Sequence, residues 1–246
     1  MYGFVTVTLF AVAPGHADDA YFEDLLKNGE SLYAQHKMEV VIRHFFKDRR
    51  DGIFVDIGCF HWKKSSNTCY LERHLGWSGI AVDAQKKFGP EWKKFRPRSK
   101  FFAYAVTDKS GETITFFQTG TESTRTGGTS STELTNIKKW QETREVEVSE
   151  ITVPTITMNE LLDREGVKKI DFLSMDINGG ETVALKGFDI KRFLPELVHV
   201  EASRHRREEL TQYFESNGYK RIDEYLKYDG INWYFTPKEP VTREAQ

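Results

Sequence analysis

The stretch FVDIGCFHWKKSSNT, from Phe54 to Thr68, decides the fold of this chain. Its apolar start predicts a buried strand, and Ser65 or Ser66 is a natural N-cap for a helix that runs on to Leu75. Between the two, Gly58 is the only glycine of the loop. Because the glycine-rich sequence G-x-G-x-x-G is missing, the stretch predicts a strand, loop and helix that do not hold a pyrophosphate.

Strands and helices alternate along the rest of the chain. Apolar runs predict buried strands at 52–57, 77–84, 101–107, 170–177 and 197–202. Helices are predicted within 21–47, where there are two, and at 65–75, 85–95, 158–165, 179–187 and 204–217. Two closing strands, 219–225 and 231–236, are joined by a predicted turn at 227–230. The pattern predicts an α/β, Rossmann-like fold with a seven-stranded, mostly parallel sheet and a terminal antiparallel hairpin.

The alternation is interrupted by two segments with a period of two. Residues 112–118 and 145–156 alternate as antiparallel strands do, and they flank Thr119–Asn136. In that segment 13 of 18 residues are threonine, serine or glycine, so we expect a loop without a core of its own. Both a lid over a site and a plain connector fit this composition.

The overall charge gives no general attraction for a polyanion. Lysine and arginine together number 35 against 37 acidic residues, so we expect no nucleic-acid partner. The two cysteines, Cys59 and Cys69, are too few for a disulfide scaffold. Together with His61 and His74 they lack the paired spacing of zinc ligands, and we predict no metal site.

The N-terminus has features of a secretory signal. Tyr2–Pro14 is apolar but too short to span a bilayer, and the small residues Gly15 and Ala17 suit a signal peptidase. Side-chain positive charge ahead of this run is missing, so an ordinary docked strand or helix is the alternative. The predicted division is a possible signal peptide at 1–17, a helical cap at 18–50, the main domain at 51–237 and a tail at 238–246. Cleavage after Ala17 would make the protein periplasmic or secreted.

Three acids lie at the carboxyl ends of predicted strands, namely Asp56, Asp83 and Asp176. Ligands of open α/β sheets bind at this edge, and buried carboxylates there call for a polar ligand or polar partners. Asp83 follows Asp56 by 27 residues, where nucleotide-binding sheets place the acid that binds ribose hydroxyls. A ligand with an adenosyl group and no phosphates would fit, and S-adenosylmethionine is such a ligand.

The segments DIGCFHWKKSSNT, GWSGIAVDA, AVTDKSGE, VPTITMNELL and IDFLSMDINGGETVALKGF are similar, in order and spacing, to the FkbM family of S-adenosylmethionine-dependent methyltransferases. The resemblance covers roughly residues 50–236. It implies the class I methyltransferase fold and transfer of a methyl group to a hydroxyl oxygen, commonly on a sugar or a natural product. The implied partner is therefore a small molecule or glycan that carries a hydroxyl group.

The resemblance also implies roles for individual residues. The implied cofactor-binding residues are Asp56, Gly58, Cys59, Phe60, Asn67, Thr68, Asp83, Ala105 and Val106. Among them, Asp83 would bind the ribose, and Ala105 with Val106 would lie near the adenine. Asn67 or Thr68 would hold the carboxylate or the amino group of the methionine part.

Methyl transfer to oxygen needs a group that removes the hydroxyl proton, and the candidates are Asp176, Glu181 and His61. His61 has the ordinary pKa closest to neutrality, whereas Glu181 could instead stabilise a helix N-terminus. The family motif after the fourth strand usually reads acid-x-acid-Gly-x-acid, but this chain has Asn178 in place of the second acid, and an amide cannot take the proton.

Export would separate the protein from S-adenosylmethionine, which is made in the cytosol. An active methyltransferase would therefore be cytoplasmic. The alternative is an exported, non-catalytic binding protein that keeps the methyltransferase fold.

Overall fold

The computed structural model describes residues 16–119, 132 and 148–240. Its elements, in chain order, are α1 (His16–Asn28), α2 (Met38–Phe46), β1 (Ile53–Ile57), α3 (Cys69–Leu75), β2 (Ser78–Asp83), η1 (Lys86–Phe88), α4 (Gly89–Phe95), β3 (Ser99–Ala103), β4 (Ala105–Val106), β5 (Thr113–Thr119), β6 (Val148–Ile156), α6 (Met158–Arg164), β7 (Phe172–Met175), α7 (Glu181–Lys186), α8 (Ile190–Phe193), β8 (Leu197–Glu201), η2 (Arg204–Arg206), α9 (Arg207–Ser216), β9 (Tyr219–Arg221), η3 (Asp223–Lys227) and β10 (Asn232–Pro237).

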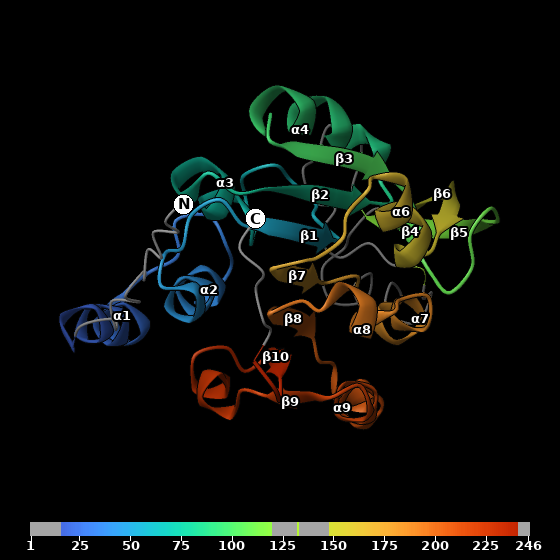
Figure 1. The fold of residues 1–246 in the computed structure, drawn as a ribbon. Coiled ribbons are helices and arrows are strands. Elements are labelled where there is room, and N and C mark those ends of the chain that lie inside the picture. The colour runs from blue at the N-terminus through green and yellow to red at the C-terminus, as the bar shows by residue number, and fades with distance from the viewer. Residues whose placement is uncertain (1–15, 120–131, 133–147, 241–246) are drawn as a thin grey trace, which may run out of the picture.

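The strands form a seven-stranded sheet of order β3-β2-β1-β7-β8-β10-β9 and a three-stranded sheet of order β4-β6-β5 (Figure 1). In the large sheet β3, β2, β1, β7 and β8 pair in parallel, whereas β10 runs antiparallel to both β8 and β9. The predicted sheet, with five parallel strands and an antiparallel pair at its end, is confirmed. Strand order reverses between β1 and β7, and this is the point at which such sheets bind ligands.

Helices cover both faces of the large sheet because neighbouring strand residues point to opposite faces (Figure 1). On one face, Val55 and Ile57 of β1 belong to a core cluster shared with α6, α7, α8 and α9. On the other face, Phe54 packs in a cluster with Val41 of α2 and Leu71 of α3. The predicted helical cap thus contributes α2 to the core of the sheet.

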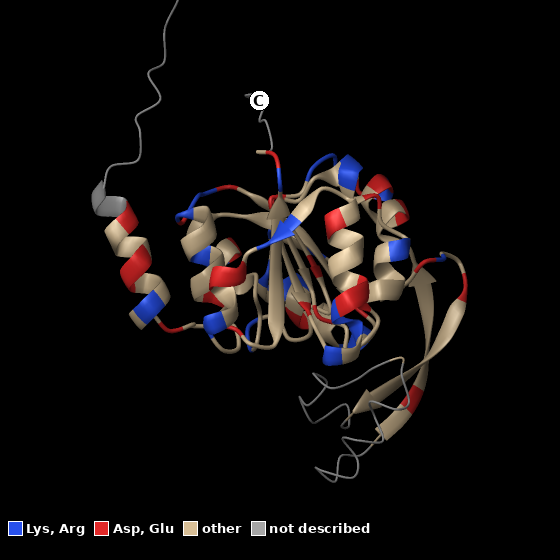
Figure 2. Cartoon of the chain, turned by 90° about the horizontal axis from the view of Figure 1, so that it is seen from below, with Lys and Arg blue, Asp and Glu red and all other residues tan. Residues whose placement is uncertain are grey.

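The three-stranded sheet extends to one side of the molecule, where the antiparallel pair β5–β6 projects beyond the main sheet (Figure 2). The predicted period-two strands are therefore confirmed as an antiparallel pair. In the same view, lysines, arginines and acidic residues are interspersed along the helices of the described chain.

The helix predicted to begin at Ser65 or Ser66 begins at Cys69, with Thr68 as its N-cap residue. Ser65 has a φ of 58° in the left-handed region, which no helix can continue. The hydroxyl of Thr68 donates to Asp56 Oδ2 at 2.8 Å instead of capping the helix. The loop after β1 is longer than predicted, because the Thr68 hydroxyl binds a strand residue and Ser65 has a backbone angle outside the helical range.

The strand predicted at 101–107 divides into two. β3 pairs with β2 as far as Ala103, and the chain then leaves the large sheet so that β4 pairs in parallel with β6. The apolar pattern continues through both pieces because each is part of a sheet, so the sequence alone does not show the break.

The closing strands pair antiparallel as predicted, but the tight turn at 227–230 is wrong. A 3-10 helix, η3, lies between them, and the buried Asp229 carboxylate accepts hydrogen bonds from the backbone and side chain of Asn232. The predicted signal segment up to Gly15, most of the predicted lid and residues 241–246 lie outside the described residues. The predicted boundary after Ala17 falls within α1.

Candidate active site

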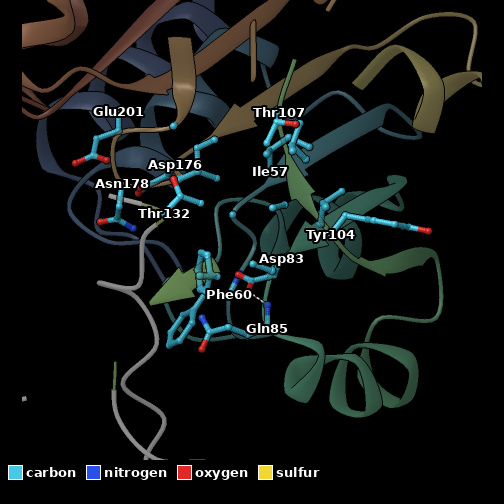
Figure 3. Close-up of a pocket in the computed structure, with 18 of the residues that line it drawn as sticks. Ile57, Phe60, Asp83, Gln85, Tyr104, Thr107, Thr132, Asp176, Asn178 and Glu201 are labelled. Carbon is cyan, nitrogen blue, oxygen red and sulfur yellow. Dashed lines mark hydrogen bonds between the residues drawn. The ribbon is translucent and has the colours of Figure 1, made fainter. Parts of the chain in front are cut away.

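A cavity of about 650 Å³ lies at the carboxyl ends of β1, β2, β7 and β8. Residues of these strand ends line it together with β4 and with residues 35, 36 and 38, which lie just before or at the start of α2. Figure 3 shows Asp83, Phe60 and Gln85 on one side of the cavity, and Asp176, Asn178 and Glu201 gathered on another. The predicted edge of the sheet thus carries a cavity.

Gly58 connects β1 to the loop at the point where β1 meets the end of β7. Its φ is +84°, and a Cβ atom built on it would lie 1.9 Å from the carbonyl oxygen of Asp176. Its amide donates to the Val82 carbonyl at 2.8 Å, which joins the loop to β2. Only glycine fits here, because both the backbone angle and the contact with Asp176 exclude a side chain.

Asp83, the last residue of β2, is buried and holds the loop through both carboxylate oxygens. The amide of Phe60 donates to Oδ2 at 3.0 Å, and that of Gln85 donates to Oδ1 at 2.8 Å. Burial raises the pKa of Asp83 to about 6. Each oxygen keeps a second lone pair, and Asp83 lines the cavity, so it can also accept from a ribose diol.

Asp56 is buried and is not among the residues that line the cavity. It accepts from the Thr68 hydroxyl, and Thr68 in turn receives a hydrogen bond at 3.1 Å from Arg96, which is fully buried. Burial raises the pKa of Asp56, while the Thr68 hydroxyl and the Arg96 charge oppose that shift. The predicted cofactor residues Asp56 and Thr68 therefore support the loop from beneath.

Arg96 connects the whole loop to the helices behind it. Its guanidinium donates to the carbonyls of Trp62 and Thr68 at 3.0 Å each and to Glu72 Oε2 at 2.6 Å. It also lies over the Trp92 ring, 4.4 Å from the centroid. A single buried side chain thus connects the loop that carries Gly58 to the helices, and no sequence motif marked Arg96 for this role.

Asn67 places an unpaired acceptor in the cavity wall. Its Nδ2 donates to Ser174 Oγ at 3.1 Å, which fixes the amide, and its buried Oδ1 has no hydrogen-bond partner among the described residues. Asn67 lines the cavity. A buried acceptor without a partner is unfavourable unless a ligand supplies a donor, and an ammonium group would do so.

Part of the cavity wall is apolar. Ala105 and Val106 of β4 are buried and line the cavity with Ile57 and Val82. An aromatic base can lie against such a wall. The division of the predicted strand at 101–107 is what turns Ala105 and Val106 toward this space.

Asp176, directly after β7, lines the cavity beside Glu201, the last residue of β8. Burial, and after it the charge of the Glu201 carboxylate, raise the pKa of Asp176 well above its usual range. Burial likewise raises the pKa of Glu201. Asn178, with a φ of 53°, lines the same end of the cavity.

The other two predicted acid–base candidates do not line the cavity. Glu181 Oε1 accepts from the amides of Ile177 and Gly179 at 2.9 and 3.2 Å, so this buried carboxyl holds the loop after β7. Burial and then the Glu201 charge raise its pKa to about 7. His61 is buried, its Nδ1 accepts from the amides of Lys63 and Lys64 at 3.0 Å, and its Nε2 lies 3.6 Å from Glu91.

Of the remaining predicted residues, Phe60 lines the cavity and Cys59 does not. Cys59 packs with Ala81, Phe88 and Trp92, and burial raises the pKa of its thiol well above the usual range. A neutral, enclosed thiol is a packing residue, so Cys59 fills space behind the loop.

Glu201 was missed although its signal was present. It is an acid at the end of an apolar run, as Asp83 is, and the same reasoning would have selected it. Gln35, His36 and Met38 were missed because nothing in a helical cap predicts that it reaches the ligand edge of the sheet.

Within residues 16–119, 132 and 148–240, no group of three or more His, Cys, Asp or Glu side chains is placed to hold a metal ion. Of the helices in this same part of the chain, none has the length and apolar character needed to cross a bilayer.

Among solved structures, the chain is similar to a TehB-like SAM-dependent methyltransferase from Corynebacterium glutamicum, at 12% identity and a TM-score of 0.46 over 90% of this chain and 98% of that one. It is also similar to the methyltransferase FkbM from Methylobacillus flagellatus, at 10% identity and a TM-score of 0.43 over 89% of this chain and 59% of that one. No curated protein matches the chain.

The strand order, the reversed end of the sheet and the cavity beyond β1 and β2 define a class I methyltransferase fold. The model of the methyltransferase FkbM domain matches residues 34–221, and the chain belongs to this family. It is a methyltransferase that depends on S-adenosylmethionine. The cavity is chemically compatible with this cofactor, since its lining offers an unpaired buried oxygen at Asn67, a hydrogen-bond acceptor at Asp83 and an apolar wall at Ala105 and Val106.

Proposed function

We propose that this methyltransferase transfers the methyl group to a hydroxyl oxygen of a sugar or natural-product-like small molecule. The observation that carries the proposal is Asp176. It lines the cavity, it lies directly after β7 against Gly58 of the loop after β1, and burial raises its pKa well above the usual range. A hydroxyl acceptor requires a base, and a raised pKa makes an ionised carboxyl a stronger proton acceptor.

S-adenosylmethionine supplies an electrophilic methyl group on a sulfonium. The protein contributes alignment, exclusion of water and a place for the hydroxyl proton. Gly58, Phe60 and Asn67 would hold the methionine part, Asp83 the ribose, and Asp176 the reacting hydroxyl. Glu181 would act by holding the loop after β7 in place.

The proposal is tested by calorimetry and by product analysis. Titration with S-adenosylmethionine and S-adenosylhomocysteine measures binding, with Asp83→Ala as the binding-deficient control. Turnover is then followed as S-adenosylhomocysteine release with methyl glucoside, methyl rhamnoside and, for comparison, glucosamine as acceptors. Mass spectrometry of the product assigns the methylated atom.

We expect micromolar or tighter cofactor binding and methyl ethers as the products. Methylation of the glucosamine nitrogen, with the glycoside hydroxyls left unmodified, would contradict transfer to oxygen. Tight cofactor binding without turnover on any hydroxyl acceptor in a wider panel would also contradict it.

A further inference from the structure

Glu201 shares its end of the cavity with Asp176. The two residues follow matched positions of neighbouring parallel strands, since Met175 pairs with Val200 in the register of β7 and β8. Both side chains line the cavity, and Figure 3 shows them with Asn178 at one end of it. The strand register alone therefore places two carboxyl groups side by side.

The two carboxyl groups influence each other, since Glu201 raises the pKa of Asp176 and Asp176 lowers that of Glu201. A hydrogen bond between two carboxyl groups exists only while one of them carries a proton. Two ionised carboxylates at hydrogen-bonding distance repel each other, so the pair is stable with one proton and one negative charge.

The surroundings favour this shared state. Glu181 of α7 and Asp56 of β1 add negative charge around Asp176. On the Glu201 side, the backbone amide of Asn178 donates to the Glu201 carboxylate, and His205 of η2 favours the ionised form of Glu201. Asp176 is thus surrounded by acids, whereas Glu201 has the groups that stabilise a negative charge.

We propose that Asp176 and Glu201 act together as one proton-sharing base, and that Glu201 is a second catalytic residue. This inference rests on the proposed transfer to a hydroxyl group. In the reaction, a lone pair of the acceptor oxygen forms the bond to the methyl carbon, and the electron pair of the broken carbon–sulfur bond stays on sulfur. The hydroxyl proton passes to the pair, which then holds two protons and releases one to solvent.

Asn232 lines the same end of the cavity and indicates which class of acceptor fits there. It lies opposite Glu201 in the antiparallel pairing of β8 and β10, and it lines the cavity. Its Nδ2 donates to both oxygens of Asp229, at 3.1 and 3.0 Å, while its buried Oδ1 has no partner among the described residues. A second hydroxyl of the acceptor would supply the missing donor, so the acceptor class is a molecule with at least two neighbouring hydroxyls.

The test compares Glu201→Gln with Glu181→Gln in the pH dependence of kcat/KM, with methyl rhamnoside as the acceptor. Glu201→Gln removes the partner carboxyl of the pair, whereas Glu181→Gln keeps the pair and removes a nearby negative charge. The acidic limb reports protonation of the singly protonated pair. We expect this limb to move to higher pH in Glu201→Gln, because the shared proton no longer stabilises the negative charge, and to move to lower pH in Glu181→Gln, because a repelling charge is lost. Glu208→Gln, an exposed change at the start of α9, controls for an added amide elsewhere.

A second readout needs no turnover. Infrared difference spectra between the wild type and each of Asp176→Asn and Glu201→Gln, recorded near neutral pH, should show loss of one carboxylic-acid band in both variants. An unchanged acidic limb in a folded Glu201→Gln variant that binds the cofactor normally would overturn the catalytic role. Absence of the band from the spectra would overturn the shared proton. If the wild type methylates no hydroxyl, the proposed function fails, and the infrared result then decides the shared proton by itself.

Discussion

Two buried polar groups lie at the same edge of the sheet and differ in how their charges are matched. Below the loop, Arg96 pairs with Glu72 and bonds to Thr68, which bonds to Asp56. At one end of the cavity, the Asp176 carboxyl faces the Glu201 carboxyl, and no ion pair of Asp176 is found within the described part of the chain. Removing one member of the matched group leaves a buried charge without its partner, whereas the carboxyl group without a cation is available for chemistry.

The largest expected effect is on catalysis, at the end of the cavity where Asp176 faces Glu201. Asp176→Asn should lower kcat by on the order of 10²–10⁴-fold, the usual contribution of a general base, because an amide cannot take the hydroxyl proton. Cofactor affinity and thermal stability should change little, since the carboxyl makes no ion pair with any residue that the structure describes. Steady-state kinetics and calorimetry measure both. Retained turnover with normal cofactor binding would remove Asp176 from the mechanism.

The matched group should respond in the opposite way. Arg96→Met leaves the Glu72 carboxylate buried without its partner and should lower the free energy of unfolding by about 3–5 kcal/mol. Arg96→Met combined with Glu72→Met should recover most of that loss, since the Glu72 carboxylate is then no longer left buried without its partner. Urea denaturation measures the difference between the variants.

Cofactor binding in the same two variants tests whether Arg96 positions the loop after β1, apart from its effect on the stability of the fold. The double variant should still bind S-adenosylmethionine more weakly than the wild type, because the bonds from Arg96 to the Trp62 and Thr68 carbonyls are missing. Normal affinity in a stable double variant would show that the loop does not depend on Arg96.

Two glycines with nearly the same backbone angle test the contact between the loop and β7. Gly58 and Gly111 have φ values of +84° and +80°, but a Cβ on Gly111 would meet nothing within 4 Å. Gly111→Ala should cost about 1–2 kcal/mol of stability, the usual penalty for a left-handed alanine. Gly58→Ala should cost more, about 3 kcal/mol or above, because the Asp176 backbone must also move. Equal losses in thermal denaturation would show that the contact with Asp176 is unimportant.

The smallest expected effect is on the pH dependence of cofactor binding. With a pKa raised to about 6, Asp83 is ionised at pH 7 and becomes protonated below pH 6. Affinity for S-adenosylhomocysteine should therefore fall about fivefold as the pH drops through this range, since a charge-assisted hydrogen bond exceeds a neutral one by on the order of 1 kcal/mol. Titrations at pH 5 to 8 measure it, and Asp83→Asn should give a flatter profile. A wild-type affinity independent of pH would exclude Asp83 from ribose binding.

The same carboxyl predicts a change in stability with the opposite sign. A raised pKa means that the folded protein binds a proton more tightly than the unfolded chain, so the Asp83 contribution to stability is greatest below the unfolded value near pH 4 and is lost as the pH rises through 6.

Sequence patterns predicted the sheet because each strand is a continuous apolar run followed by a turn or a polar residue. The same rule selected Asp56, Asp83 and Asp176, and all three lie at the predicted edge. It missed the division of the strand before Ala105, since residues of two different sheets are equally apolar. It also placed Asp56 among the ligand-binding groups, although that side chain faces Thr68 below the cavity.

The sequence by itself determined the class of fold, the family and the cofactor, because these follow from the order and spacing of local segments. Only the tertiary structure decided which polar groups meet. Arg96 is 28 residues from Thr68, and Glu201 is brought to Asp176 by the register of two strands. Which acid is matched by a cation and which faces another acid depends on such long-range pairings, and no local pattern records them.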